Sequence, residues 1–316
     1  MQSPLPRRFL AWMNERFPFA NALLFFSLYA TAVLVGQVAT SPGEVAFGLR
    51  EIAGFLPVWC FFFLLRIYDE HKDYEEDCQN YPDRVLQRGL ITLGHLKVAG
   101  ALAIVTQLVG SLWLDGGFGI ITLWWIAVFV YSVLMTVEFF VREWLTQRLV
   151  LYATSHMLIM PLAVLWMVQI GAGDQPLPLE VGYLAALAFL CGGAFEVTRK
   201  IRAPEEEREE VDSYTKVFGT TGAPLVVAVL LTLATGALAM LLIWIADGMP
   251  SVGWFGALVA ILLASLIPLQ RFRSTPSPKG RKTNEVLVSL SMIASYIVVI
   301  AFVAVYHGIS WGGPGL

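Results

Sequence analysis

The sequence predicts an all-α membrane protein in which residues 1–316 form a single polytopic domain. Hydrophobic residues make up 57% of the chain and charged residues only 14%, whereas soluble domains typically carry about 25% charged residues. A chain with so little charge cannot cover a globule with solvated side chains. Its apolar residues also gather in segments of about 20, the length that a helix needs to cross a bilayer. We therefore expect transmembrane helices in a lipid bilayer.

Nine apolar segments are long enough, or nearly so, to cross the membrane. A helix satisfies all of its own backbone polar groups in lipid, so each segment is predicted to be helical. The segments comprise residues 18–40, 47–65, 98–114, 117–136, 149–170, 181–195, 224–246, 252–269 and 286–305.

The positions of Lys and Arg predict the orientation of these segments. All but one of the 21 Lys and Arg residues lie in the N-terminal tail or in the loops after the second, fourth, sixth and eighth segments; the exception is Arg50. Positively charged loops stay on the cytoplasmic side of a membrane. We therefore expect a multi-pass protein of the inner or plasma membrane, with a cytoplasmic N-terminus and an external C-terminus.

Charge and cysteine content exclude several other classes of protein. A formal net charge of −3 leaves no basic excess for a phosphate backbone, so no nucleic-acid partner is expected. Cys60, Cys78 and Cys191 are too scattered for a disulfide framework or a zinc site. The first apolar run is long and lacks a small-residue cleavage pattern, so we expect no cleavable signal peptide.

The acidic residues gather in two loops that are predicted to face the cytoplasm. Seven of the 24 Asp and Glu residues fall between Asp69 and Asp83, and seven more fall between Glu196 and Asp212. The first of these loops covers about residues 66–97 and the second about residues 196–222. They follow the second and the sixth apolar segments, so both are candidates for a functional site.

The first acidic loop has the spacing of a cation site. If the second segment continues as a helix beyond the membrane, Asp69, Glu70, Asp73 and Asp77 share one stripe. Like charges at this spacing destabilise a helix unless a cation or solvent intervenes. Oxygen ligands in a row suit Mg²⁺, which takes one or two carboxylates together with waters and substrate phosphate oxygens. The four carboxylates are therefore predicted magnesium ligands.

Two arginines follow this stripe. Guanidinium groups bind phosphate oxygens in a bidentate manner, so Arg84 and Arg88 are predicted to hold a diphosphate beside the metal. The alternative is a solvated cytoplasmic loop with no ligand. The direct continuation of a membrane span into the stripe favours the functional interpretation.

These residues resemble the UbiA superfamily of intramembrane prenyltransferases. That superfamily has nine transmembrane helices and two aspartate-rich cytoplasmic motifs, and its first motif is N-D-x-x-D-x-x-x-D followed by R-P-L-x-x-G. Here Asp69 stands at the asparagine, Glu70 at the first aspartate, and Asp73 and Asp77 match outright. The run 84–89 keeps the second element apart from its proline. The resemblance implies a UbiA-like bundle with two acidic cytoplasmic loops over a central cavity.

The second loop departs from the pattern of the superfamily. Glu196 matches the leading acid, but Lys200 stands four residues later where another acid is usual. A lysine there cannot bind Mg²⁺, although Lys200 and Arg199 could neutralise a diphosphate directly. By the same resemblance Glu196 and Asp212 are candidate ligands of a second metal. The glutamate run 205–210 is expected to be solvated surface.

Four residues near the fourth and fifth segments complete the candidate set. In the superfamily this region supplies basic and tyrosine side chains to the diphosphate, which implies that role for Arg142, Arg148 and Tyr152. Positive-inside anchoring explains the two arginines equally well. His156, close to the interface, is either a catalytic group that activates the acceptor or a hydrogen-bonding residue between helices.

The resemblance implies Mg²⁺-dependent transfer of a prenyl group from an isoprenyl diphosphate to an unidentified acceptor within the membrane. Asp73, Asp77, Lys200 and His156 are the expected catalytic residues. A close alternative is an intramembrane terpene cyclase, which would ionise the same diphosphate without an acceptor. A transporter is the alternative from another class, but the centres of the nine segments contain no Asp, Glu, Lys or Arg, unlike ion-coupled carriers.

Overall fold

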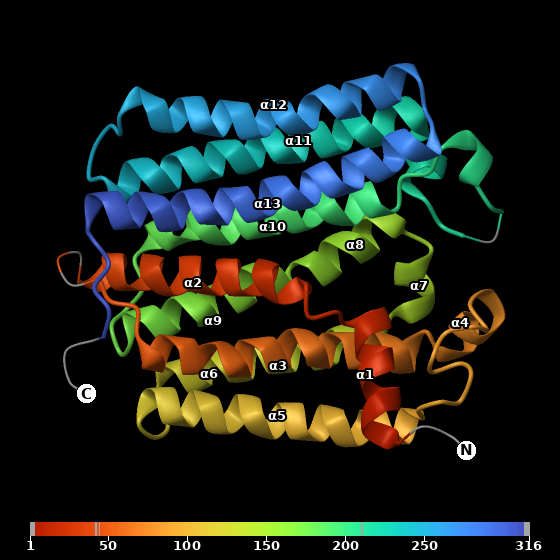
Figure 1. Cartoon of the computed structure of the whole chain (residues 1–316), viewed down its shortest axis with the longest axis horizontal. Helices are drawn as coiled ribbons and strands as arrows, with labels where there is room; N and C mark the ends of the chain where they lie inside the picture. The colour runs from red at the N-terminus through yellow and green to blue at the C-terminus, as the bar shows by residue number, and fades with distance from the viewer. Residues whose placement is uncertain (1–3, 42, 44, 210, 313–316) are drawn as a thin grey trace.

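The computed structural model describes residues 4–41, 43, 45–209 and 211–312, and the elements in these ranges are helices. Figure 1 shows the long helices running roughly parallel to one another, with turns and loops at the two ends of the bundle. The helices of the first half are α1 (Leu5–Arg16), α2 (Asn21–Thr40), α3 (Leu49–Lys72), α4 (Tyr74–Asn80), α5 (Leu93–Asp115), α6 (Ile120–Thr136), η1 (Glu138–Phe140) and α7 (Arg142–Thr146). Those of the second half are α8 (Leu149–Met157), α9 (Ile159–Ala172), η2 (Leu179–Val181), α10 (Gly182–Arg199), η3 (Pro204–Glu206), α11 (Tyr214–Ile245), α12 (Val252–Ser274) and α13 (Pro278–Tyr306).

The protein is an integral membrane protein, as the sequence predicts. Within the described residues, eight helical segments are long and apolar enough to cross a bilayer, and α8 and α9 together make one of them. The apolar helix α6 has 17 residues and lies among them in Figure 1. Each of the nine predicted segments therefore coincides with a helix, whereas nine crossings remain a prediction.

Several helices extend beyond their apolar segments into the charged loops. The helix predicted for residues 47–65 continues through Arg66 to Lys72, as the carboxylate stripe required. It ends there, however, because Asp73 caps α3 with φ −97° and ψ 8°, and α4 starts a separate helix at Tyr74. The expectation of one uninterrupted stripe up to Asp77 is therefore wrong.

Close helix packing forms the middle of the bundle. A Cβ atom on Gly36 of α2 would lie 2.1 Å from the Val168 carbonyl oxygen of α9, and one on Gly171 would lie 2.0 Å from the Val33 carbonyl oxygen. Only glycine permits the two backbones to approach this closely. Trp166 and Phe61 are fully buried in the apolar core beside this contact.

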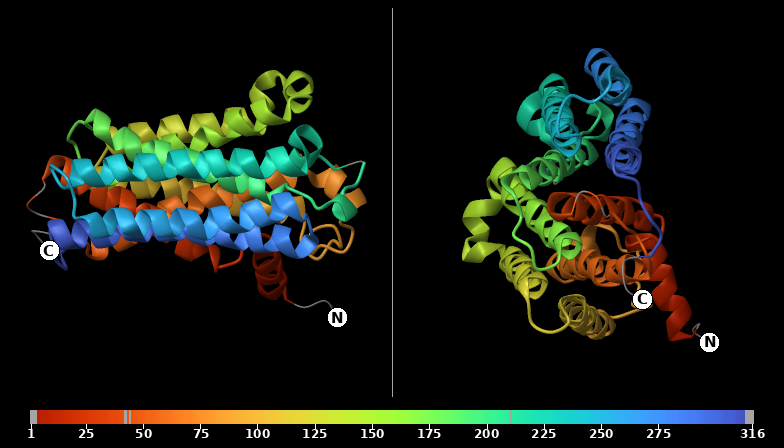
Figure 2. Two further views of the ribbon diagram at one scale, coloured as in Figure 1. Left: turned by 90° about the horizontal axis from the view of Figure 1, so that it is seen from above. Right: turned by 90° about the vertical axis from the view of Figure 1, so that its left-hand side faces the viewer.

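Most of the charged loops lie at one end of the bundle, which we call the charged end. Figure 1 shows α1, α4 and α7 together at this end, and the loop between α10 and α11 lies there too, whereas the C-terminus lies at the opposite end. The end-on view in Figure 2 places α12 and α13 on the opposite side of the bundle from α5. The fold thus brings the two acidic loops, which are more than a hundred residues apart, to the same end.

Cysteine accessibility tests the predicted orientation of this end. After replacement of Cys60, Cys78 and Cys191, single cysteines at Gln79 and Glu207 should react only from the cytoplasmic side, because both loops carry the positive-inside charges. A cysteine at Gly173, in the turn after α9, should react from outside. Labelling of position 79 by an impermeant reagent on intact cells would contradict the orientation.

Candidate functional site

A buried aromatic residue packs the N-terminal helix against the charged end. Trp12 of α1 is fully buried against Ile67 of α3 and against Leu86 and Leu96 of the following loop and helix. Residues four apart lie on the same face of a helix, so the buried position of Trp12 directs Arg16 toward the same side. The hydrophobic contact of α1 therefore delivers a guanidinium group to the first acidic loop.

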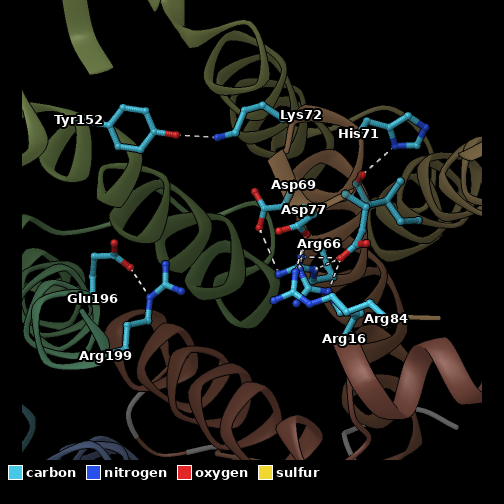
Figure 3. A network of polar contacts seen from close by, with 12 residues as sticks. Arg16, Arg66, Asp69, His71, Lys72, Asp77, Arg84, Tyr152, Glu196 and Arg199 are labelled. Carbon is cyan, nitrogen blue, oxygen red and sulfur yellow. Dashed lines mark hydrogen bonds and ion pairs between the residues drawn. The ribbon is translucent and has the colours of Figure 1, made fainter. Parts of the chain in front are cut away.

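Glu70 is neutralised by two arginines. Its side chain is fully buried, and Oε1 lies 2.5 Å from Arg16 Nε and 2.5 Å from Arg66 Nη2. Figure 3 shows these guanidinium groups gathered in one cluster beside Arg84. Glu70 Oε2 has no hydrogen-bond partner among the described residues. A buried carboxylate is tolerated only when it is paired, so the two arginines allow α3 to carry this charge.

Asp77 belongs to the same cluster. Arg84 Nη1 lies 2.6 Å from Asp77 Oδ2, and Arg16 Nη2 reaches the same oxygen at 3.5 Å. The Arg84 guanidinium also lies 3.7 Å from the centre of the Tyr81 ring, a cation–π contact. Arg16 thus links α3 to α4, and Arg84, a predicted diphosphate ligand, is paired with a predicted metal ligand.

Asp69 and Asp73 are the less neutralised of the four predicted metal ligands in this loop. The Asp69 side chain is 45% exposed, and its nearest cation, Arg66 Nη1, lies 3.8 Å away. Burial raises the pKa of Asp73 above its ordinary value, and the negative charges of Asp69, Asp77 and Glu76 raise it further against the opposing effect of Lys72. This pair therefore lies in a negative field that a cation would relieve.

The described residues contain no group of three or more His, Cys, Asp or Glu side chains placed to hold a metal by themselves. A magnesium site in this protein would therefore take only one or two carboxylates from the chain. The remaining ligands would be waters or substrate oxygens, which is the usual arrangement for Mg²⁺.

The second loop presents a paired carboxylate as well. Arg199 Nε lies 2.5 Å and Lys200 Nζ 2.9 Å from the two oxygens of Glu196. The charges of Arg199 and Asp69 act on one another across the gap between the loops, and Figure 3 shows Arg199 directed toward the side of the first-loop cluster. The structure therefore brings the two predicted motifs together. Asp212 is exposed, away from these ion pairs.

The glutamate run of the second loop is not simply solvated surface, contrary to expectation. Glu207 accepts hydrogen bonds from the hydroxyls of Ser213 and Thr215. Glu206 pairs with Arg281 at the start of α13, with 2.9 Å between Oε2 and Nε. Glu210 lies outside the described residues. These contacts fix the loop to the following helix and to α13.

A cleft of about 550 Å³ lies against the second loop. Tyr81 contributes to its wall from the first loop, Arg199 from the second and Arg281 from α13. The second loop and α13 therefore form most of this hollow, and Tyr81 is its contribution from the first loop.

A third cluster lies beside these two motifs. Lys72 Nζ donates a hydrogen bond of 2.6 Å to the Tyr152 hydroxyl and lies 3.5 Å from Glu138 Oε1. His156 stacks on the Tyr152 ring, with 4.0 Å between the ring centres. The charge of Asp69 acts on Lys72, so this cluster borders the first loop.

The remaining predicted residues lie apart from these contacts. Arg88, Arg142 and Arg148 are exposed, and Arg148 lies over the Trp144 ring at 4.5 Å. Within the described part of the chain, these three arginines form no ion pair with the motif carboxylates. Positive-inside anchoring is sufficient to explain their positions.

Similar proteins were found by comparison of structures and not by comparison of sequences. No protein-family model matches the sequence, and no curated protein matches it. A UbiA homologue from Aeropyrum pernix K1, solved without ligand, superposes with a TM-score of 0.62 over 90% of this chain and 98% of its own, at 12% identity. A UbiA homologue from Archaeoglobus fulgidus bound to GPP and Mg²⁺ gives 0.54 over 92% and 99%, at 13% identity. The chain has the UbiA fold.

A third UbiA-fold protein extends the comparison. A digeranylgeranylglyceryl phosphate synthase superposes with a TM-score of 0.57 at 18% identity, over 96% of this chain and 99% of its own. Nearly complete coverage of all three neighbours means that the whole bundle follows the UbiA arrangement. The predicted fold class is confirmed. The roles of individual residues in the loops stay predictions.

Sequence reasoning missed four residues of this UbiA-fold site: Arg16, Arg66, Lys72 and Glu138. Arg66 had a signal, because it precedes Glu70 by four positions on the same helix. Lys72 also stood out as a cation inside an acidic motif. Nothing in the local sequence linked Arg16 or Glu138 to these loops, since their contacts depend on tertiary packing.

Substitution of Arg16 tests the pairing of Glu70. Arg16→Ala should lower the free energy of unfolding by roughly 1–3 kcal/mol, because a buried carboxylate would keep only Arg66. Denaturant unfolding in a single detergent provides the measurement, with the exposed Arg7→Ala as the matched control on the same helix. Adding Glu70→Gln to Arg16→Ala should recover part of the loss. Equal stability of Arg16→Ala and Arg7→Ala would contradict the assignment.

The ion pair between Glu206 and Arg281 should make the stability of the folded protein depend on pH. Burial alone would raise the pKa of Glu206, but hydrogen bonds from Arg281 and from the Ala203 N–H lower it below its ordinary value. A carboxylate whose pKa is lowered on folding stabilises the folded protein when the pH is above the pKa that it has in the unfolded state. This stabilisation disappears as the pH falls through the pKa that it has in the folded state. Glu206→Gln should therefore melt below the parent protein at pH 7, and the two melting temperatures should converge as the pH is lowered through the folded-state pKa of Glu206. The exposed neighbour Glu205→Gln serves as the control and should show no such convergence.

Proposed function

We propose that the chain catalyses Mg²⁺-dependent transfer of a prenyl group from an isoprenyl diphosphate to an acceptor within the membrane. The observation that carries this proposal is the convergence of acidic and basic side chains from both motif loops at one end of a UbiA fold. The Archaeoglobus fulgidus neighbour is bound to GPP and Mg²⁺, which supports a prenyl diphosphate and magnesium as ligands here.

The residues of the first loop fit a magnesium ion that is shared with the substrate. Asp69 and Asp73 are one helical turn apart, and their mutual repulsion is what a divalent cation would remove. Glu70, Asp77 and Glu196 would bind metal only after giving up arginine or lysine partners. We therefore assign the metal to Asp69 and Asp73.

The cations around this pair would bind the diphosphate. Arg84, Arg199 and Lys200 each lie within an ion pair at the charged end, and each offers N–H donors that suit phosphate oxygens. Magnesium, when bound, would supply further positive charge at the same oxygens. Lys200 would stand where a second metal ligand is usual, because its ammonium can pair with a phosphate oxygen as a point charge.

The chemistry of the transfer needs the rest of the bundle. As the bond between the prenyl carbon and the diphosphate oxygen breaks, negative charge develops on the leaving group and positive charge on the allylic carbon. Donors fixed at the charged end would stabilise the leaving diphosphate. The prenyl chain would extend into the apolar bundle, where exclusion of water protects the cation until the acceptor attacks.

Asp73 provides the test of this function. In liposomes with geranyl, farnesyl or geranylgeranyl diphosphate, the parent protein should release diphosphate only with Mg²⁺. Asp73→Ala should reduce turnover at least ~100-fold, equivalent to about 2.7 kcal/mol of transition-state stabilisation. The exposed Glu75→Ala serves as the matched control on the adjacent helix and should keep its activity.

Two outcomes would contradict the proposal. If none of the three substrates shows either Mg²⁺-dependent binding or Mg²⁺-dependent diphosphate release, a prenyl diphosphate is not the substrate. A cyclic hydrocarbon or alcohol formed without any acceptor would replace prenyl transfer by the cyclase alternative.

A further inference from the structure

The second loop folds back on itself, so that its last residues lie beside its first. The Tyr214 N–H donates a hydrogen bond of 3.2 Å to the Lys200 carbonyl oxygen. Ser213 caps α11, because its Oγ accepts a hydrogen bond of 3.1 Å from the Lys216 N–H. These two bonds place Tyr214, the first residue of α11, beside the end of α10, which carries the paired carboxylate of Glu196.

The ring of Tyr214 is held by its packing. Tyr214 is 1% exposed and belongs to the buried apolar cluster that also contains Ile201 and Val288. Its ring lies parallel to that of Phe218, with 6.4 Å between the ring centres and 1° between the planes. Gly219, with φ 72° and ψ 170°, interrupts the helix directly after this first turn, a conformation that glycine adopts without strain. The fold therefore sets the position of the Tyr214 hydroxyl.

This hydroxyl is a buried donor that lacks a partner. Within the described residues it makes no hydrogen bond. Buried polar groups are nearly always hydrogen-bonded, so an exception needs an explanation. Packing does not supply one, because a phenylalanine would bring the same ring to the cluster. The hydroxyl group itself is therefore available to a ligand.

Charged residues of the second loop lie close to this hydroxyl. Glu196 and Arg199 both act on it electrostatically. Arg199 also interacts with Asp69, one of the two proposed metal ligands. The two cations of this loop are already paired, since Arg199 and Lys200 each contact an oxygen of Glu196. Tyr214 thus offers a neutral donor beside the cations of the proposed diphosphate site.

We propose that the Tyr214 hydroxyl donates a hydrogen bond to a phosphate oxygen of the prenyl diphosphate. This inference rests on the proposed prenyl transfer and adds a substrate-binding residue to its diphosphate site. A phosphate oxygen suits the donor, because a hydrogen bond to a charged acceptor is roughly twice as strong as one between neutral groups. Glu196 is the poorer partner, since both of its oxygens already have cations.

The contact involves no proton transfer. When the bond between the prenyl C1 and the diphosphate oxygen breaks, the electron pair leaves with the diphosphate, and Tyr214 keeps its proton. Inorganic pyrophosphate retains every oxygen of this leaving group. Its binding therefore reports the contact separately from the transfer reaction.

Tyr214→Phe tests the contact in the full chain, because it removes the hydroxyl and keeps the ring. Titration calorimetry with inorganic pyrophosphate and Mg²⁺ should show a Kd at least ~10-fold above that of the parent protein, the low end for a hydrogen bond to a charged group. Tyr296→Phe is the matched control. The Tyr296 hydroxyl is also buried without a partner in the described chain, but its ring lies in the apolar core of the bundle. This control should bind pyrophosphate as the parent does.

Two further measurements separate substrate binding from a structural role. In liposomes, Tyr214→Phe should raise KM for geranylgeranyl diphosphate more than it lowers kcat, because the contact is present before the bond breaks. In denaturant the variant should be at least as stable as the parent protein, because the hydroxyl has no partner to lose among the described residues.

The outcomes distinguish this inference from the function on which it rests. If the parent protein releases diphosphate but Tyr214→Phe keeps the parent's affinity for pyrophosphate, the inference is wrong and the proposed function stands. An equal loss of affinity in Tyr296→Phe would also overturn it. If none of the three prenyl diphosphates shows Mg²⁺-dependent binding or release, the proposed function fails and the inference fails with it.

Discussion

The fold of the charged end depends on the neutralisation of Glu70. This carboxylate is carried into a fully buried position by the last turn of α3, where an unpaired charge would cost several kcal/mol. Arg66 supplies one guanidinium from the same helix, but Arg16 must come from α1. Three other features occur together with this one pairing. Trp12 packs beneath the first loop, α1 crosses over the bundle, and Arg16 also links α3 to α4.

Much of the architecture could be predicted because lipid restricts the options of a chain. Apolar segments of about 20 residues must be helices, and the distribution of Lys and Arg fixes which loops share a side. The predicted segments accordingly coincide with helices, and both acidic loops lie at one end. The ends of helices were less predictable. The predicted apolar segment ends at Leu65, yet α3 continues to Lys72, because backbone hydrogen bonds and the pairs of Arg66 stabilise a more polar turn as well.

The partners of the motif residues were much harder to predict. Carboxylate spacing correctly identified where charge would gather, but it could not show that arginines would pair with Glu70 and Asp77. Glu138 illustrates the limit most clearly. Its sequence neighbours are apolar. Its carboxylate is directed toward Lys72 by a left-handed turn that contains no glycine and therefore could not be predicted from the sequence. Contacts of this kind depend on the packing of α3 and α8 and not on any local pattern.

The last turn of α3 also explains how one short motif can face two separate clusters. At 3.6 residues per turn, Lys72 lies roughly 160° around the helix from Glu70, and Asp69 and Asp73 occupy the sector between them. Glu70 faces the arginine cluster on one side, and Lys72 faces Tyr152 and Glu138 on the other. The two carboxylates between them, Asp69 and Asp73, therefore form no close ion pair among the described residues, because the neighbouring cations are already paired with other groups. The arginine cluster and the cluster of Lys72, Tyr152 and Glu138 thus adjoin along a single helical turn, with the proposed metal ligands at their boundary.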